Sequence, residues 1–376
     1  MEDTSEKKSS KGSKGTSDKK STAKKSTAKK ASEKKSASKK ASDKKGAAKK
    51  TSEKKTSEKK TSEKKVTAKA VGEYIEKVVL DAMPEADGMS DKVRDAMVYA
   101  VEAGGKRVRP ALMYLTYKGF SEKLADKSLR KKHDKAIESF IAAIEMIHTY
   151  SLIHDDLPAL DNDSMRRGKP TVHTAFGEDI AILAGDGLLN YAYETAAKSF
   201  IVSPGDTDLE KALLILASKP GLYGMLGGQT LDVVLTGTEP TKEQLSYIYS
   251  NKTAALLECA VTIGATLAGI SGDNLDKLQN AAYYVGMAFQ VQDDILDVTG
   301  DKDVLGKDVS QDEKNGKVTF VTIYGLEKAA EYVRQASELA IGLIDEAYNN
   351  VMKDAPDNQY IKLLKDMIIK LITREK

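Results

Sequence analysis

Acidic and basic side chains stand close together in one short stretch of this sequence. The stretch closes an apolar helical run and contains, in order, Asp155, Asp156, Asp161, Asp163, Arg166 and Arg167. Carboxylates at this density repel one another unless cations lie between them, and oxygen ligands of this kind suit Mg²⁺, which also takes substrate phosphates as ligands. The two arginines suit bidentate binding of phosphate. The alternative is an acidic turn followed by two solvated arginines.

A second acidic cluster lies far downstream. Gln290, Asp293, Asp294 and Asp297 belong to an apolar run that extends from 275 to 298. Asp293 and Asp297 are four positions apart, so on a helix they share one face, which Gln290 joins. Carboxylates are costly on an otherwise apolar surface. Two clusters that each close an apolar helix predict a cavity in which they face each other and hold Mg²⁺. A solvated helix end is the alternative.

These clusters carry a family resemblance. Residues 155–161, Asp-Asp-Leu-Pro-Ala-Leu-Asp, resemble the first aspartate-rich motif of the trans-isoprenyl diphosphate synthases, in the form with two extra residues, and residues 293–297 resemble the second. The resemblance begins near Ala70 and extends to the C-terminus. It implies an Mg²⁺-dependent short-chain prenyltransferase that joins isopentenyl diphosphate to an allylic diphosphate, the isoprenoid synthase fold and a homodimer.

The resemblance also implies residue roles. It places Mg²⁺ at Asp155, Asp156, Asp161, Asp293, Asp294 and Asp297. It implies that the diphosphate of isopentenyl diphosphate is held by Lys106, Arg109, His148 and Arg167. It implies that the allylic substrate is contacted by Arg166, Lys252, Thr253, Gln290 and Lys307, in a site also lined by Gln229 and Asp232 and followed by Lys317. The catalytic set is then Asp155, Asp161, Asp293, Lys252 and Lys307.

Local chemistry agrees with several of these roles. The loop 103–109 offers glycines and three cations before Pro110, which opens a helix with free amides, so it predicts a phosphate site, with an ordinary basic loop as the alternative. His148 lies seven before Asp155, on nearly the same helical stripe, although a lone histidine there is more often a core residue. Glycines at 224–228 permit close helix packing beside Gln229.

The spacing within the first motif requires a break in the helix. Asp155 and Asp161 are six positions apart, which corresponds to about 240° on a helix, so they would face different ways. Pro158 interrupts the hydrogen-bond ladder between them. We therefore expect a bulge that brings Asp161 back beside Asp155.

Helical periodicity dominates the chain after residue 70, and alternation typical of a hairpin is not found. The expected helices are 70–80, 90–102, 110–120, 134–155, 179–200, 206–218, 222–235, 242–250, 253–268, 273–298, 318–324, 326–352 and 360–373. They predict one large all-α bundle of long helices around a central cavity. Cys259 is expected in its core, and His133 and His173 on the surface or in loops.

Residues 1–69 differ sharply in composition from residues 70–376. This segment holds 25 lysines and nine acidic residues, a net charge of +16, and because the whole chain is +3 the remainder carries −13. Its pentads ending in Lys-Lys predict a disordered tail. The tail would contact nucleic acid, an anionic membrane or another polyanion, or serve only as a solubilising extension. We expect no transmembrane segment and a cytoplasmic protein, since a single cysteine fits a reducing compartment.

Product length depends on residues one turn before the first motif. Ser151 and Tyr150 precede Asp155 by four and five positions. Ser151 is small, whereas Tyr150 is large enough to close the pocket, with simple packing between helices as the alternative role. The family resemblance implies that an aromatic side chain near this depth, together with the two extra residues of the first motif, goes with farnesyl diphosphate, and geranylgeranyl diphosphate is the alternative product. A class I terpene cyclase would carry a mixed second motif of Asn, Ser and Glu. A non-catalytic polyanion-binding protein would need no complete metal set.

Overall fold

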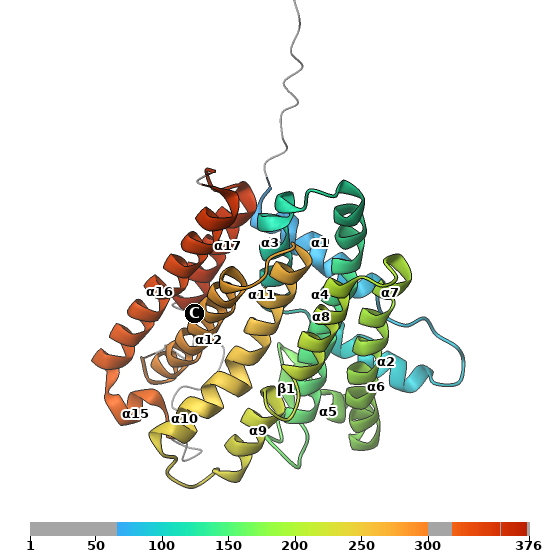
Figure 1. The fold of residues 1–376 in the computed structure, drawn as a ribbon. Helices are drawn as coiled ribbons and strands as arrows, with labels where there is room; N and C mark the ends of the chain where they lie inside the picture. The colour runs from blue at the N-terminus through green and yellow to red at the C-terminus, as the bar shows by residue number, and fades with distance from the viewer. Residues whose placement is uncertain (1–65, 300–317, 354, 374–376) are drawn as a thin grey trace, which may run out of the picture. The chain divides into compact units, whose positions relative to one another are not determined.

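The structure, a computed structural model, describes residues 66–299, 318–353 and 355–373. Helices dominate these residues (Figure 1), which confirms the expected all-α fold. In chain order the elements are α1 (Ala68–Asp81), α2 (Asp91–Glu102), α3 (Val108–Phe120), η1 (Ser121–Lys123), α4 (Lys127–Asp155), β1 (Met165–Arg166), β2 (Lys169–Pro170), α5 (Val172–Phe176), α6 (Glu178–Ala197), α7 (Ser199–Val202), α8 (Thr207–Ser218), α9 (Met225–Val234), α10 (Lys242–Ile248), η2 (Tyr249–Ala254), α11 (Ala255–Leu267), α12 (Asp273–Thr299), α15 (Phe320–Tyr324), α16 (Leu326–Met352) and α17 (Gln359–Ile372).

Polar residues cap the first turn of several helices. The side chain of Thr67 accepts a hydrogen bond from the amide of Ala70 at the start of α1, and Asn358 does the same for the first amides of α17. Thr241 and Gln244 form a reciprocal capping box at α10. These bonds satisfy amides that have no partner within the helix. The residue types at these positions therefore favour the start of a helix there.

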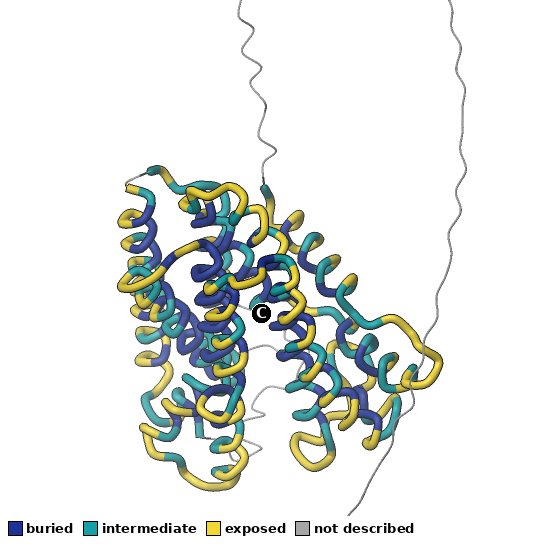
Figure 2. Tube along the Cα trace, turned by 45° about the vertical axis from the view of Figure 1, so that its right-hand side comes forward, coloured by how far each residue is buried: buried dark blue, intermediate teal, exposed yellow. Residues whose placement is uncertain are grey.

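α11 lies at the centre of the helical core. All of its residues are buried, as expected for a helix that is apolar on every side, and it packs against α3, α4, α8 and α12. A Cβ on Gly264 would lie 2.4 Å from the carbonyl oxygen of Met113, so this glycine permits the close approach of α3. Cys259 is buried on α11, as expected. Figure 2 shows the buried positions on helix faces that turn inward.

The two aspartate clusters close two long helices. α4 packs along α6 and ends at Asp155, whereas α12 packs along α16 and carries Asp293 to Asp297 in its last turns. Among the described residues, α4 alone is long and apolar enough to cross a membrane by length and composition, and 72% of its most apolar window is buried inside the protein. The burial of α4 agrees with a role in the core.

Two sequence-based expectations were wrong. A short hairpin does exist: Met165 pairs with Pro170 and Arg166 with Lys169. Its turn places both Arg167 and Gly168 at positive φ, which matches the twist of paired strands. His133, expected on the surface or in a loop, is fully buried. Its Nδ1 lies 2.7 Å from the carbonyl oxygen of Leu267, and its Nε2 lies 2.8 Å from Oδ2 of Asp206. Two polar partners offset the cost of burying the ring.

Candidate active site

The end of α4 has the bulge that Pro158 predicts. The backbone amide of Asp161 donates to the carbonyl oxygen of Asp155 at 2.9 Å, so the chain loops out between them and returns. Asp155 is half-buried and accepts a 2.8 Å hydrogen bond from Nε2 of Gln229 on α9. Burial raises the pKa of Asp155 to about 6, with Lys252 opposing the rise and Asp161 adding to it. The first motif thus presents a partly desolvated carboxylate with a second acid beside it.

Asp156 is oriented differently from its neighbour. Its side chain is buried and accepts hydrogen bonds from Nε and Nη2 of Arg166, at 2.7 and 2.5 Å. Burial raises the pKa of Asp156, and the bonds from Arg166 oppose this effect. The pair joins the end of α4 to strand β1 of the hairpin. In this structure Asp156 holds the hairpin in place.

The second motif divides in a similar way. Asp293 and Asp297 are half-buried on the last turns of α12, whereas Asp294 is buried. Asp294 accepts hydrogen bonds from the hydroxyl of Tyr249 and from the amide of Phe320, the latter at 3.0 Å. It therefore connects α12 to η2 and to the first residue of α15. Neither Tyr249 nor Phe320 was marked by the sequence, since their role depends on contacts 45 and 26 residues away.

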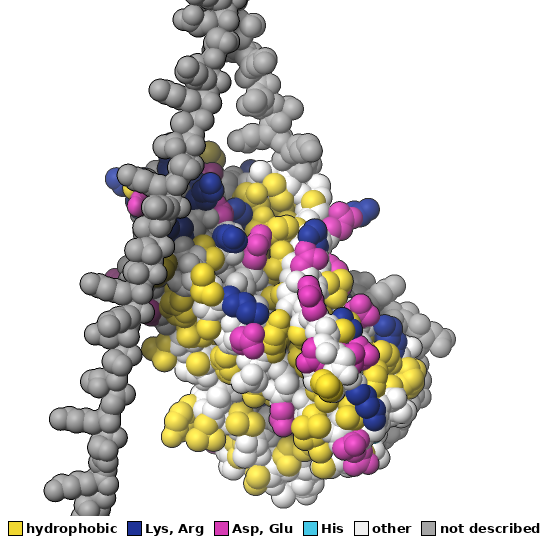
Figure 3. Space-filling view, turned by 90° about the vertical axis from the view of Figure 1, so that its right-hand side faces the viewer, with side chains coloured by type: hydrophobic (Ala, Val, Ile, Leu, Met, Phe, Trp, Pro, Cys, Tyr) yellow, Lys and Arg dark blue, Asp and Glu magenta, His cyan; other side chains and the backbone are white. Residues whose placement is uncertain are grey.

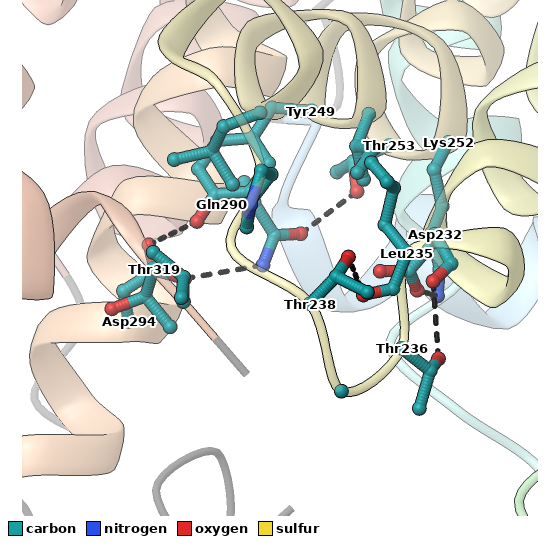
Figure 4. Close-up of a pocket in the computed structure, with 15 residues that line it drawn as sticks. Asp232, Leu235, Thr236, Thr238, Tyr249, Lys252, Thr253, Gln290, Asp294 and Thr319 are labelled. Atoms are coloured by element: carbon teal, nitrogen blue, oxygen red, sulfur yellow. Dashed lines mark hydrogen bonds and ion pairs between the residues drawn. The ribbon is translucent and has the colours of Figure 1, made fainter. Parts of the chain in front are cut away.

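Lys252 and Thr253 lie on η2, a π-helical turn that leads into α11. Nζ of Lys252 is 2.5 Å from Oδ2 of Asp232, and Oγ1 of Thr253 donates to Oε1 of Gln290 at 2.8 Å. Figure 4 shows these four side chains around one pocket of about 110 Å³, which Tyr249 and Asp294 also line. The structure thus brings together residues from α9, η2 and α12, as the resemblance implies.

Two glycines allow η2 to lie between α9 and α12. A Cβ on Gly228 of α9 would be 2.2 Å from the amide nitrogen of Lys252, and one on Gly286 of α12 would be 2.3 Å from Cβ of Ala254. Any side chain at either position would displace the backbone that carries Lys252 and Thr253. π-helical turns are rare and often occur at functional sites.

Cationic side chains surround His148 on α4. Burial lowers its pKa well below the usual range, and the charges of Arg109 and Arg167 lower it further. Nε of Arg109 is buried and has no hydrogen-bond partner in the described part of the chain. Arg167 donates to the carbonyl oxygen of Gly104 and covers Gly105, where a Cβ would meet its guanidinium at 2.8 Å. The ring is neutral among arginines, an arrangement suited to a bound polyanion.

The remaining predicted residues have varied positions. Lys106 is exposed in the loop before α3, and Lys307 and Lys317 lie outside the described residues. Ser151 is half-buried and its hydroxyl donates to the carbonyl oxygen of His148 at 2.9 Å. Within residues 66–299, 318–353 and 355–373, no three His, Cys, Asp or Glu side chains form a ready metal site. An Mg²⁺ ion here would need additional oxygens from substrate and water.

Tyr150 lies on α4, five residues before Asp155. Its ring is half-buried and meets the ring of His154 edge-on, with centroids 5.9 Å apart. Burial raises the pKa of Tyr150 to about 12, and Tyr193 and Asp155 contribute. His154 packs on α6 where Gly185 has no side chain, since a Cβ there would lie 2.1 Å from Nε2 of His154. His154 had no role in the sequence analysis, and here it joins α4 to α6.

The fold and the site define a helical protein with an acidic cluster at the end of α4 and a cationic cluster around His148 of the same helix. The polyprenyl synthetase family matches residues 90–357, and the chain belongs to that family. It is 40% identical to the farnesyl diphosphate synthase of Geobacillus stearothermophilus over 70% of this chain and 82% of that protein. It is also 40% identical to the geranylgeranyl diphosphate synthase of Cyanophora paradoxa, over 78% and 90% of the two chains.

Solved structures agree with the sequence comparisons. The geranyltransferase of Helicobacter pylori, solved with magnesium and isoprenyl diphosphate, is 29% identical, with a TM-score of 0.67 over 81% of this chain and 95% of that one. A farnesyl/geranylfarnesyl diphosphate synthase of Zymomonas mobilis has the same identity and TM-score. The chain is a prenyltransferase, a short-chain trans-prenyl diphosphate synthase of the farnesyl and geranylgeranyl type.

Proposed function

We propose that this enzyme condenses isopentenyl diphosphate with dimethylallyl or geranyl diphosphate and releases farnesyl diphosphate and diphosphate. The observation that carries the proposal is the pair of sites on α4. The cationic pocket around His148, Arg109 and Arg167 suits the diphosphate of isopentenyl diphosphate. The acidic end of the same helix, at Asp155, suits the metal-bound allylic diphosphate. The two substrates would then lie side by side with their reacting carbons close together.

Asp155, Asp161 and Asp293 are the residues that would hold Mg²⁺. Carboxylate oxygens are donors that fit this hard cation, and burial raises the pKa of Asp155, a cost that a bound cation would offset. When bound, Mg²⁺ neutralises the diphosphate and lowers the barrier to C–O ionisation. Asp156 and Asp294, which the resemblance also assigns to the metal, instead bond Arg166 and Tyr249. We propose that Asp156 and Asp294 hold the neighbouring elements in place and do not bind the metal themselves.

The side chains of this chain would bind and orient the two substrates. Lys252, Thr253 and Gln290 would contact the allylic diphosphate from positions around the pocket in Figure 4. Arg166, on strand β1, would contact the same diphosphate. The apolar helix faces below would exclude water from the allylic cation. The double bond of isopentenyl diphosphate attacks that cation to form the new C–C bond, and the departing diphosphate takes the proton that is lost.

Tyr150 supports the farnesyl product. Its half-buried ring closes the wall against His154 and α6, one turn below Asp155. A growing chain extends away from the diphosphate and would meet this ring after three isoprene units. Geranylgeranyl diphosphate is the alternative product.

The proposal also covers the oligomeric state of the enzyme, the binding partner of the tail and the cellular location. Large hydrophobic side chains are exposed on α6 and α9, among them Ile182, Leu183, Leu226 and Val234, and we propose that a second copy covers them in a homodimer. Figure 3 shows one face of the molecule on which hydrophobic side chains alternate with acidic and basic ones. Binding of a polyanion by the lysine-rich tail and a cytoplasmic location stay predictions.

The assay that tests the proposal uses radiolabelled isopentenyl diphosphate with dimethylallyl or geranyl diphosphate. Label should accumulate in a product of three isoprene units only when Mg²⁺ is present. Four-unit product would replace the farnesyl assignment with the geranylgeranyl one. A cyclised hydrocarbon, or no label incorporated, would exclude the proposed reaction.

A further inference from the structure

We propose that Arg107 is a positioning residue that orients the loop 103–109 for isopentenyl diphosphate without contacting it. The inference rests on the proposed function, because it takes Lys106 and Arg109 as the groups that bind the diphosphate. In the sequence, Arg107 is one of three cations within residues 103–109, together with Lys106 and Arg109. The structure separates it from the other two.

The guanidinium of Arg107 is enclosed by protein acceptors. Nε and Nη2 donate to the two carboxylate oxygens of Glu76 at 2.8 and 3.1 Å, and Nη1 donates to Oε1 of Glu145 at 2.8 Å. Nη2 also donates to the carbonyl oxygen of Val101 at 2.6 Å. The residue is 5% exposed. Its planar fork is used on three segments, α1, α4 and the end of α2, so it joins the loop to all of them.

The backbone at Arg107 explains why these bonds bear on its neighbours. Arg107 has φ 45° and precedes the first turn of α3, a left-handed conformation that non-glycine residues adopt rarely. Surrounding contacts must hold such a residue in place. The side chain of Arg107 is buried, whereas Lys106 before it is exposed. Arg109, two residues later, has a buried Nε without a hydrogen-bond partner among the described residues.

Glu145 connects this network to the rest of the cationic pocket. It is buried, lies three residues before His148 on α4, and opposes the fall in the pKa of Arg109 and Arg167 that burial causes. For Arg107 itself burial lowers the pKa, yet the bonds to Glu76 and the charge of Glu145 raise it overall. One buried carboxylate thus interacts with three guanidinium groups and stabilises their charges.

Arg107→Lys tests the proposal because it keeps the charge and removes the fork. We expect the KM for isopentenyl diphosphate to rise about tenfold, because a small misplacement of the groups that bind a substrate weakens its binding. The KM for geranyl diphosphate should change less than about twofold. Arg334→Lys on α16 is the matched control, since this exposed arginine also bonds two carboxylates, Glu331 and Glu338. It should alter neither KM.

Glu76→Gln provides a milder second variant if Arg107→Lys does not fold. The Glu76 side chain is 39% exposed, so loss of its charge should leave the melting temperature close to that of the wild type, while the KM for isopentenyl diphosphate still rises selectively. If both KM values stay unchanged, or rise equally in folded protein, Arg107 has only a stabilising role. Failure of the proposed function would instead appear in the wild type, as an absence of condensation product.

Discussion

Nε2 of Gln229 donates a hydrogen bond of 2.8 Å to Oδ1 of Asp155 and thereby joins α9 to the end of α4. Oε1 of the same glutamine is buried without a partner in the described residues. Asp155 is therefore oriented by a neutral donor that leaves its charge in place, which suits a carboxylate that must also accept a cation. The proposed metal ligand is therefore oriented by the protein itself.

Loss of a proposed metal ligand should reduce turnover far more than stability. Asp155→Ala or Asp293→Ala removes a carboxylate from a charge-neutralising cluster, and we expect kcat to fall by about 10²–10³-fold. Thermal melts should show folded protein, because relief of carboxylate repulsion opens no core cavity. Asp81→Ala, at an exposed ion pair with Lys77, serves as the control. Near-wild-type turnover at saturating Mg²⁺ would remove the assignment.

Tyr150→Ala should lengthen the product by at least one isoprene unit. The ring packs against that of His154 one turn before Asp155, and its truncation would open space along α4. Ser151→Ala is the matched control because it stays small and loses only a hydroxyl bonded to the carbonyl oxygen of His148. Chromatography of the extracted products decides between them. An unchanged product in the Tyr150 variant would place the floor on another helix.

Gly286→Ala should destabilise the protein by about 1–3 kcal/mol, because the new methyl group would overlap Cβ of Ala254 and push on η2. Gly342→Ala on α16 is the control. A Cβ there meets nothing within 4 Å, so this change should stabilise the helix by about 1 kcal/mol. Urea denaturation measures both. Equal effects from the two substitutions would show that η2 adapts to a side chain.

Acid should weaken the contact between α4 and α8. Burial raises the pKa of Asp206, but the hydrogen bonds from His133 and Ser203 lower it by more than burial raises it. The pKa of Asp206 therefore lies below the ordinary value of 3.8. A depressed acid contributes stability that is present above its ordinary pKa and is lost as pH falls through the folded one. The free energy of unfolding should therefore drop below about pH 4. Asp206→Asn should lower stability at pH 6 and flatten this drop, and a drop of unchanged size would assign it to other carboxylates.

Removal of the tail should separate catalysis from polyanion binding. A protein that starts at Val66 keeps Thr67, the cap of α1, and should fold and turn over like the full chain. Its affinity for DNA, polyphosphate or anionic vesicles should fall and lose its steep salt dependence, because the 25 lysines of residues 1–69 are nearly all gone. If the full chain binds none of these at low salt, the tail is only a solubilising extension.

The sequence predicted what depends on local pattern. Most helices followed from periodicity, although α4 begins at Lys127 rather than at 134 and the helix expected over 179–200 is divided into α6 and α7. The bulge before Asp161 followed from Pro158, and the clusters at Asp155 and Asp293 followed from charge in apolar runs. It could not separate Asp155 from Asp156, because which carboxylate pairs with Arg166 depends on the hairpin that follows. Arg107 and its neighbours are chemically alike in sequence. Only the distant Glu76 and Glu145 distinguish them.

The hydrogen bond from the amide of Asp161 to the carbonyl oxygen of Asp155 makes the first motif tolerant of length. Pro158 and Ala159 are exposed at the outer edge of the loop that this bond closes. The two carboxylates are therefore held by the ends of the loop, and only its exposed tip is free to vary, because Asp156 inside the loop is bonded to Arg166. A tip that is one residue shorter or longer should leave Asp155 and Asp161 in place, so the spacing between these two carboxylates is set by the closing hydrogen bond rather than by the number of residues in the tip.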